Sequence, residues 1–71
     1  MAPPDRVLHD LGKALRAIRM ERGLSQEELS LRTGIHRNYI GGIERGERSP
    51  TVARVATLAD ALDVSVRDLF P

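Results

Sequence analysis

Residues 25–46 decide the fold, and they read SQEELSLRTGIHRNYIGGIERG. The first four of them form a capping box, in which the Ser25 hydroxyl can accept a hydrogen bond from the Glu28 amide while the Glu28 carboxylate accepts one from the Ser25 amide. The helix that begins after this box is predicted to run to about Thr33. Gly34 then ends it, because glycine adopts left-handed backbone angles at little steric cost.

A second helix follows almost at once, from near His36 to about Arg45, and Gly46 supplies its stop. Two short helices joined by so tight a turn meet at a steep angle, so they cannot both bury all their faces. Ile40 and Ile43 are spaced to point inward. The start and the outer side of this helix carry polar residues or no side chain at all, namely Arg37, Asn38, Gly41, Gly42 and Arg45.

This outer side is suited to nucleic acid. An arginine can hydrogen-bond two acceptors of a guanine, and an asparagine can match a donor and an acceptor of adenine. The start of a helix also favours a phosphate. Gly41 and Gly42 each cost roughly 1 kcal/mol relative to alanine in a helix interior. The glycine pair therefore needs a reason, which is either the close approach of DNA or packing against another helix.

Three further helices are predicted, so we expect an all-α chain of five short helices without strands. Apolar spacing predicts a first helix over about 5–22, stopped by Gly23, and residues 1–4 are expected to be a flexible tail before one domain of residues 5–71. The residues expected to face the core from the first two helices are Val7, Leu8, Leu11, Leu15, Ile18 and Leu29.

The last two helices follow the central unit. Ser49 and Pro50 match a helix cap followed by a proline at the first helical position, which predicts a helix from there to about Leu62. Ser65 with Asp68 indicates a last short capped helix over residues 66–70. The residues of the longer helix expected to face inward are Val52, Val55, Ala56, Ala59 and Leu62, and Ile35 is expected to pack inward from the central turn.

The composition excludes several classes of function. With 71 residues and no cysteine, the chain has a thin core and neither a disulfide nor a thiolate metal site. His9 and His36 lack a spaced carboxylate cluster, and the serines fall at caps or on helix surfaces without a nearby histidine base. No apolar run approaches bilayer length, and the first residues do not resemble a signal peptide. We expect a cytoplasmic protein that is not an enzyme and needs no metal, cofactor or membrane.

A charged pair is expected inside the fold. Glu44 falls on the inner side of its helix with Ile40 and Ile43, and a buried carboxylate needs a cation. Arg19 flanks the apolar stripe of the first helix and is the expected partner, with Arg22 as the alternative. Such a pair would be structural, because it would fix the helix of residues 36–45 against the first helix.

The sequence resembles the Cro/CI-type (XRE) helix-turn-helix family over roughly residues 8–70. The resemblance rests on residues 24–29 (LSQEEL), 33–40 (TGIHRNYI) and 43–46 (IERG). Within that family, the run from His36 to Arg48 is most similar to controller proteins of restriction–modification systems. The resemblance implies a λ-repressor-like domain and the same Arg19–Glu44 pair. It also implies a sequence-specific transcription regulator that places the helix after Gly34 in the major groove of DNA.

The resemblance also implies roles for single residues. Arg37 and Asn38 match positions that read bases, and Gln26 matches a position that contacts the phosphate backbone. Tyr39 matches a position that contacts backbone or bases in the controller proteins, although its ring could instead cover the edge of the core. Arg48 matches a loop arginine that reaches DNA. Two more residues complete the expected interface: Gly41, where the family commonly has a polar contacting side chain, and Arg45, whose charge could instead fold back onto the end of its helix.

Two copies are expected to bind one operator. A monomer reads few base pairs, so a homodimer on a near-palindrome is predicted, with half-sites about one helical turn apart. The expected dimer surface consists of Val64, Val66, Leu69 and Phe70, which could instead form a lid on the core. A regulator of this kind could also contact RNA polymerase.

The balance of charge keeps a second hypothesis open. Eleven basic residues stand against ten acidic ones, which gives a net charge of +1 and argues only weakly for nucleic acid. A protein-interaction module, such as an antitoxin or an adapter, is therefore the alternative. The polar side of the helix after Gly34 favours a DNA-binding protein.

Overall fold

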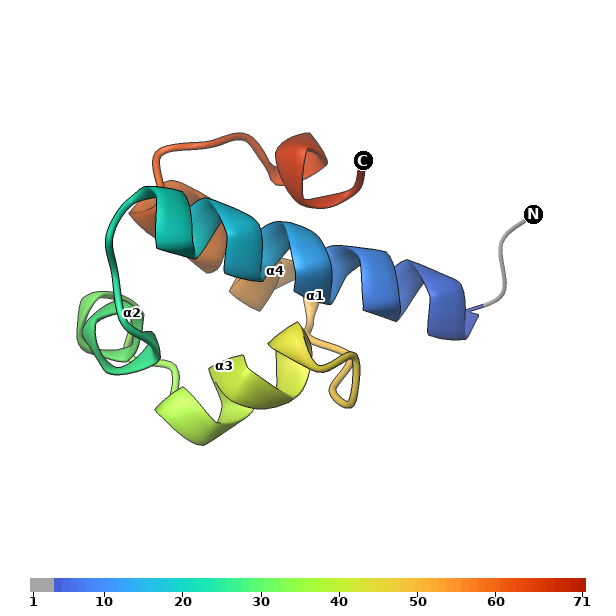
Figure 1. Cartoon of the computed structure of the whole chain (residues 1–71), viewed down its shortest axis with the longest axis horizontal. Coiled ribbons are helices and arrows are strands. Elements are labelled where there is room, and N and C mark those ends of the chain that lie inside the picture. The colour runs from blue at the N-terminus through green and yellow to red at the C-terminus, as the bar shows by residue number, and fades with distance from the viewer. Residues whose placement is uncertain (1–3) are drawn as a thin grey trace.

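The longest helix, α1 (Pro4–Glu21), lies across the other elements, as Figure 1 shows. It is followed by α2 (Gln26–Thr33), α3 (Arg37–Glu44), α4 (Val52–Ala61) and a short 3₁₀ helix, η1 (Val66–Leu69). The computed structural model describes residues 4–71, and within that range the chain is all-helical without strands. The expected flexible tail lies outside the described residues at positions 1–3. The structure therefore confirms the predicted all-α class.

Three predicted boundaries need correction. α1 begins at Pro4, one residue before the expected start, since a proline is tolerated where helical N–H groups have no acceptor anyway. The cap of α4 is Thr51 rather than Ser49, because the Thr51 hydroxyl accepts the hydrogen bond from the Arg54 amide at 3.2 Å. The last element is a 3₁₀ helix and ends at Leu69, so four α-helices and one 3₁₀ helix replace the five expected.

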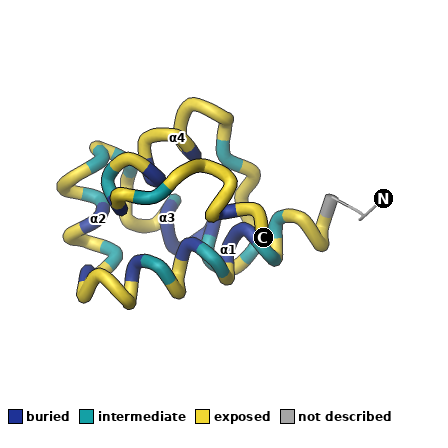
Figure 2. Tube along the Cα trace, turned by 90° about the horizontal axis from the view of Figure 1, so that it is seen from above, coloured by how far each residue is buried: buried dark blue, intermediate teal, exposed yellow. Residues whose placement is uncertain are grey.

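The core fills the space that α1 encloses with the other helices, and the inner surface of each helix is buried (Figure 2). α1 contacts α3 and η1, α2 contacts α3 and α4, and α4 contacts η1. The buried apolar residues are Leu11, Leu15, Leu24, Leu29, Ile40, Ile43, Val55, Leu58, Ala59, Leu62 and Leu69, with Ile18 and Ile35 packed against them.

The inner face of α4 differs from the prediction. Val52 is 81% exposed and Ala56 is also exposed, whereas Leu58 is buried although it was not expected to be. Because the helix begins at Val52 rather than at Pro50, its first turn lies at the edge of the core. The buried stripe therefore runs from Val55 to Leu62 at spacings of three and four residues.

Gly12 allows α1 to approach the end of α3 closely. A β-carbon at this position would collide with the carbonyl oxygen of Ile43 and would lie 2.6 Å from that of Glu44. Both obstacles are backbone atoms, which cannot rotate away as a side chain can. Only glycine therefore fits at this crossing of α1 and α3.

The expected pair between Arg19 and Glu44 is present beside this crossing. Nε of Arg19 donates to Glu44 Oε2 at 2.7 Å and Nη2 donates to Oε1 at 3.0 Å, and the two side chains are 10% and 3% exposed. Nη1 of Arg19 donates to the carbonyl oxygen of Leu24 at 2.7 Å. The hydrogen bonds to Glu44 raise the pKa of Arg19, so the guanidinium stays charged. Arg22, the alternative partner, donates instead to the carbonyl oxygen of Leu62.

We expect Gly12→Ala to destabilise the protein although alanine favours helices. The gain in helix propensity of about 1 kcal/mol is smaller than the cost of overpacking against backbone, which is about 1–3 kcal/mol or more. The midpoint of urea unfolding measures the change, and Lys13→Ala on the exposed side of α1 serves as the control. A Gly12→Ala variant more stable than the wild type would contradict the close crossing.

Glu44→Gln is expected to cost about 3–5 kcal/mol of folding free energy, because it leaves the Arg19 charge buried without a counter-ion. The matched control is Asp10→Asn, which removes the exposed ion pair between Arg6 and Asp10 and should cost about 1 kcal/mol or less. Denaturant unfolding of both variants gives the comparison. Equal losses for the two would show that burial does not strengthen the inner pair.

Candidate nucleic-acid interface

The turn between α2 and α3 is built as the sequence predicts. Both hydrogen bonds of the capping box between Ser25 and Glu28 are present at 2.9 Å. Gly34 has a φ of +75°, and its amide donates to the carbonyl oxygen of Ser30 at 2.8 Å. His36 then caps α3, with its Nδ1 accepting a hydrogen bond from the Asn38 amide at 3.0 Å. Only three residues therefore separate the end of α2 from the start of α3, whose direction is fixed by both caps.

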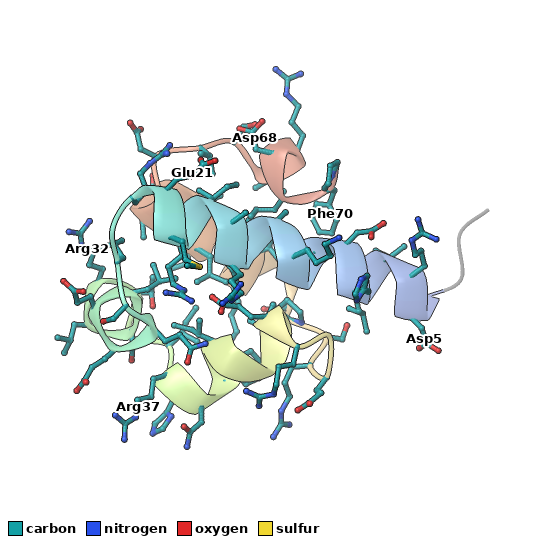
Figure 3. The ribbon with its side chains drawn as sticks, viewed as in Figure 1. Asp5, Glu21, Arg32, Arg37, Asp68 and Phe70 are labelled. Carbon is teal, nitrogen blue, oxygen red and sulfur yellow. The ribbon has the colours of Figure 1, made fainter. Side chains whose placement is uncertain are left out.

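Arg37 and Asn38 lie exposed at the start of α3, and Figure 3 shows Arg37 pointing away from the body of the molecule. Nη1 of Arg37 lies 3.7 Å from Oε2 of Glu27, and both side chains are more than half exposed. An ion pair of this kind is worth at most about 1 kcal/mol. Both residues are thus free to meet a partner in solvent.

Gln26, the predicted phosphate contact, is tied to the buried ion pair. Its Nε2 donates to Glu44 Oε1 at 3.0 Å, which joins α2 to α3. An amide nitrogen has two hydrogens, so one of them remains for a second acceptor. The residue is half-buried at the first position of α2, and its predicted contact with phosphate stays a prediction.

Both glycines of α3 are buried, and side chains of the same chain cover them. A β-carbon on Gly41 would lie 3.0 Å from Nη1 of Arg45 and 3.3 Å from Oε1 of Gln26. A β-carbon on Gly42 would lie 2.6 Å from Cγ of Arg48. The pair therefore makes room for these side chains, and at Gly41 one of them, Gln26, belongs to another helix, α2. Any contact of Gly41 with DNA stays a prediction.

Arg45 lies back along α3, and no hydrogen bond from its side chain to the end of this helix is present among the described residues. Its guanidinium reaches the level of Gly41, and its Nε pairs with Oε2 of Glu47 at 3.1 Å. The ion pair is exposed on both sides, so it leaves Arg45 accessible to a partner.

Tyr39 covers the edge of the core, as the alternative interpretation has it, and its contact with DNA stays a prediction. The residue is half-buried and packs against the core, while its ring lies beneath two arginines. The guanidinium carbon of Arg48 is 5.8 Å from the ring centroid and that of Arg54 is 4.8 Å away. Nη1 of Arg54 also donates a long hydrogen bond of 3.4 Å to the Tyr39 hydroxyl. Arg54 was not singled out in the sequence, where nothing indicates that the first turn of α4 reaches Tyr39.

The expected dimer residues divide into two groups. Leu69 is fully buried and Val64 is half-buried against the core, so these two act as the lid that was the alternative interpretation. Val66 is 38% and Phe70 45% exposed, and Figure 3 shows Phe70 beside α1. Both line an apolar hollow of about 220 Å³, whose other lining residues are Val7, Leu8, Leu11, Ser49, Pro50, Val52 and Val55.

No helix within residues 4–71 has the length and apolar character that crossing a bilayer requires.

Comparison with known proteins places this geometry in a family. The helix-turn-helix family model matches residues 15–69. The control protein C.SmaI of Serratia marcescens is 44% identical over 60 residues, which cover 84% of this chain and 71% of that protein. The control protein C.BamHI of Bacillus amyloliquefaciens is 37% identical over 60 residues, covering 83% and 74%. The crystal structure of the restriction–modification controller protein C.AhdI from Aeromonas hydrophila superposes with a TM-score of 0.86 at 44% identity, covering 89% of this chain and 96% of that one.

The matched segment includes the capped α2, the turn at Gly34, and α3 with its exposed arginine and asparagine. The similarity to the controller proteins extends over most of their length as well as most of this chain. This chain therefore belongs to the XRE-type helix-turn-helix family of DNA-binding transcriptional regulators.

Proposed function

We propose that the protein is a cytoplasmic regulator that binds a near-palindromic DNA operator as a homodimer, with α3 in the major groove and α2 across the backbone. The exposed pair Arg37 and Asn38 at the start of α3 carries this proposal. Both side chains can form bidentate contacts with base edges, and neither is buried by the rest of the described chain. The similarity to control proteins supports a role of the same regulatory kind.

The polar residues around α3 support contact with the DNA backbone. Gln26 at the start of α2 keeps a free amide hydrogen, and Arg45 and Arg48 lie along the buried glycines of α3. The amide N–H of Gln26 and the guanidinium groups of the two arginines can donate to phosphate oxygens. Contacts of this kind position a protein on the duplex without reading its sequence. In this arrangement the backbone contacts flank the two residues that read bases.

The apolar hollow supports the homodimer. Val7, Val52, Val66 and Phe70 all have exposed apolar surface, and all four line the hollow between α1, α4 and η1. Two copies related by a two-fold axis would present the same surface to each other, so each of these residues would be buried in both copies. Val66 and Phe70 remain the proposed centre of this surface, with Val7 and Val52 beside them.

Arg37→Ala should reduce the preference for operator over random DNA by about 1–3 kcal/mol for each half-site, because a base contact is lost there while phosphate contacts remain. The operator is first selected from a random DNA pool, and both affinities are then measured by fluorescence anisotropy. The matched control is Arg67→Ala, an exposed arginine of η1, which lies on the side of α1 away from α3 (Figure 1).

Equal losses on operator and random DNA in the Arg37→Ala variant would contradict base reading by this residue. Wild-type binding should also weaken steeply as salt rises, because phosphate contacts release counterions. A protein partner bound tightly at fixed stoichiometry, together with weak salt dependence towards DNA, would instead favour an interaction module.

Phe70→Asp should raise the dimer dissociation constant by about 30-fold or more, since a central aromatic residue of an interface contributes about 2 kcal/mol or more. Sedimentation equilibrium measures the constant. Leu31→Asp is the control, because Leu31 is 82% exposed on α2 and does not line the hollow. A wild-type protein that stays monomeric at high concentration, or an unchanged constant in Phe70→Asp, would place the interface elsewhere.

A further inference from the structure

Three side chains from different parts of the chain converge beside α3. Tyr39 comes from α3, Arg48 from the loop after it and Arg54 from the first turn of α4. Both guanidinium groups lie over the same ring, at 5.8 and 4.8 Å from its centroid. We call these three residues the arginine–tyrosine cluster.

Each arginine is anchored at one point, Arg48 at its stem and Arg54 at its backbone. The stem of Arg48 passes over Gly42, where a β-carbon would approach its Cγ to 2.6 Å. The backbone of Arg54 is held by the cap of α4, through its amide bond to the Thr51 hydroxyl. Both arginines therefore reach Tyr39 from anchored points.

The arginine–tyrosine cluster carries two positive charges that no carboxylate balances. Among residues 4–71, neither Arg48 nor Arg54 is within ion-pair distance of an acidic side chain, whereas Glu27 pairs with Arg37 and Glu47 with Arg45. The ring face attracts each cation only weakly at an exposed site, and the two cations repel each other. An anion that bridges them would remove this repulsion.

The donors of the cluster are of the kind that suits a phosphate group. The Tyr39 hydroxyl accepts from Arg54, which leaves its own proton free to be donated outward. Each guanidinium also has unused N–H donors in a planar fork that suits phosphate oxygens. All three groups thus have donors for an anion that accepts only.

We propose that Arg54 completes, with Tyr39 and Arg48, a clamp for one phosphodiester group of the DNA backbone. The inference rests on the proposed function and deepens it, because Tyr39 lies on α3 two residues after Arg37. The clamp would fix the depth and direction of α3 in the groove from a helix outside the helix-turn-helix unit. It carries affinity that is independent of DNA sequence.

The test compares Arg54→Ala, Arg54→Lys and the wild type in binding to operator and to random DNA over a range of salt concentrations. Arg54→Ala should weaken both complexes by about tenfold for each protomer bound, as expected for one lost charge-assisted contact per copy. Because a dimer carries two Arg54 residues, the slope of log affinity against log salt should become shallower by about 1.8, which is about 0.9 for each lost phosphate contact. Arg54→Lys should restore most of the slope but less of the affinity, since lysine keeps the charge without the planar fork.

Two controls separate this role from others. Arg67→Ala should leave affinity and slope unchanged, and urea unfolding of Arg54→Ala should have the wild-type midpoint, so that a loss of binding is not a loss of fold. Combining Tyr39→Leu with Arg54→Ala should weaken binding by less than the product of the two single effects, because both residues serve one phosphate.

The outcomes distinguish the inference from the proposed function. If the wild type prefers its operator and Arg54→Ala keeps both the wild-type affinity and the wild-type salt slope, the clamp is wrong while the function stands. If Arg54→Ala weakens operator binding alone, Arg54 reads a base and the clamp is again wrong. If the wild type shows no salt-dependent binding to DNA, the proposed function itself fails.

Discussion

The buried ion pair between Arg19 and Glu44 is the constraint on which the rest of the structure depends. One guanidinium binds both oxygens of Glu44 on α3 and the carbonyl oxygen of Leu24 before α2, and Gln26 at the start of α2 binds the same carboxylate. Three helices are thus joined at one point. Apolar packing alone would let short helices slide or rotate, whereas directional hydrogen bonds to a buried charge accept only one arrangement. The desolvation cost of such a pair means that its contribution is orientation more than net stability.

This orientation decides which residues remain at the surface. Ile40, Ile43 and Glu44 are held inward, while Arg37 and Asn38 lie exposed in the first turn of α3. The exposed acids nearby pair with Arg37 and Arg45 at 3.7 and 3.1 Å, and exposed pairs of this kind are weak. They balance the charges of Arg37 and Arg45 in the free protein, yet they can be exchanged for phosphate at little cost. A net charge of +1 is therefore compatible with a DNA-binding surface.

Local features of the sequence predicted the centre of the fold, and tertiary features were missed. The capping box at Ser25 and the stop at Gly34 were predictable because each acts within one helix. The inward carboxylate of Glu44 was predictable because a buried charge needs a cation. The cap of α4 was misplaced because Ser49 and Thr51 can both cap, and the choice depends on where the loop enters the core.

The same limit applies to the functional surfaces. An apolar residue near the end of the chain can face its own core or a second copy, so Leu69 and Phe70 could not be told apart by pattern. Arg54 was missed because its approach to Tyr39 depends on how α4 packs after the loop, which no spacing along the chain records.

The glycines show how the packing and the interface are connected. Gly12 admits the backbone of α3 against α1, while Gly42 admits the stem of Arg48 and Gly41 admits Arg45 and Gln26. A helix of eight residues with two interior glycines gives up about 2 kcal/mol of helix propensity relative to alanine. Packing against α1 and α2 offsets this cost, and the vacated space lets long side chains lie flat along the helix. The glycines of α3 therefore act on the interface indirectly, because they set the direction in which Arg45 and Arg48 cross this helix.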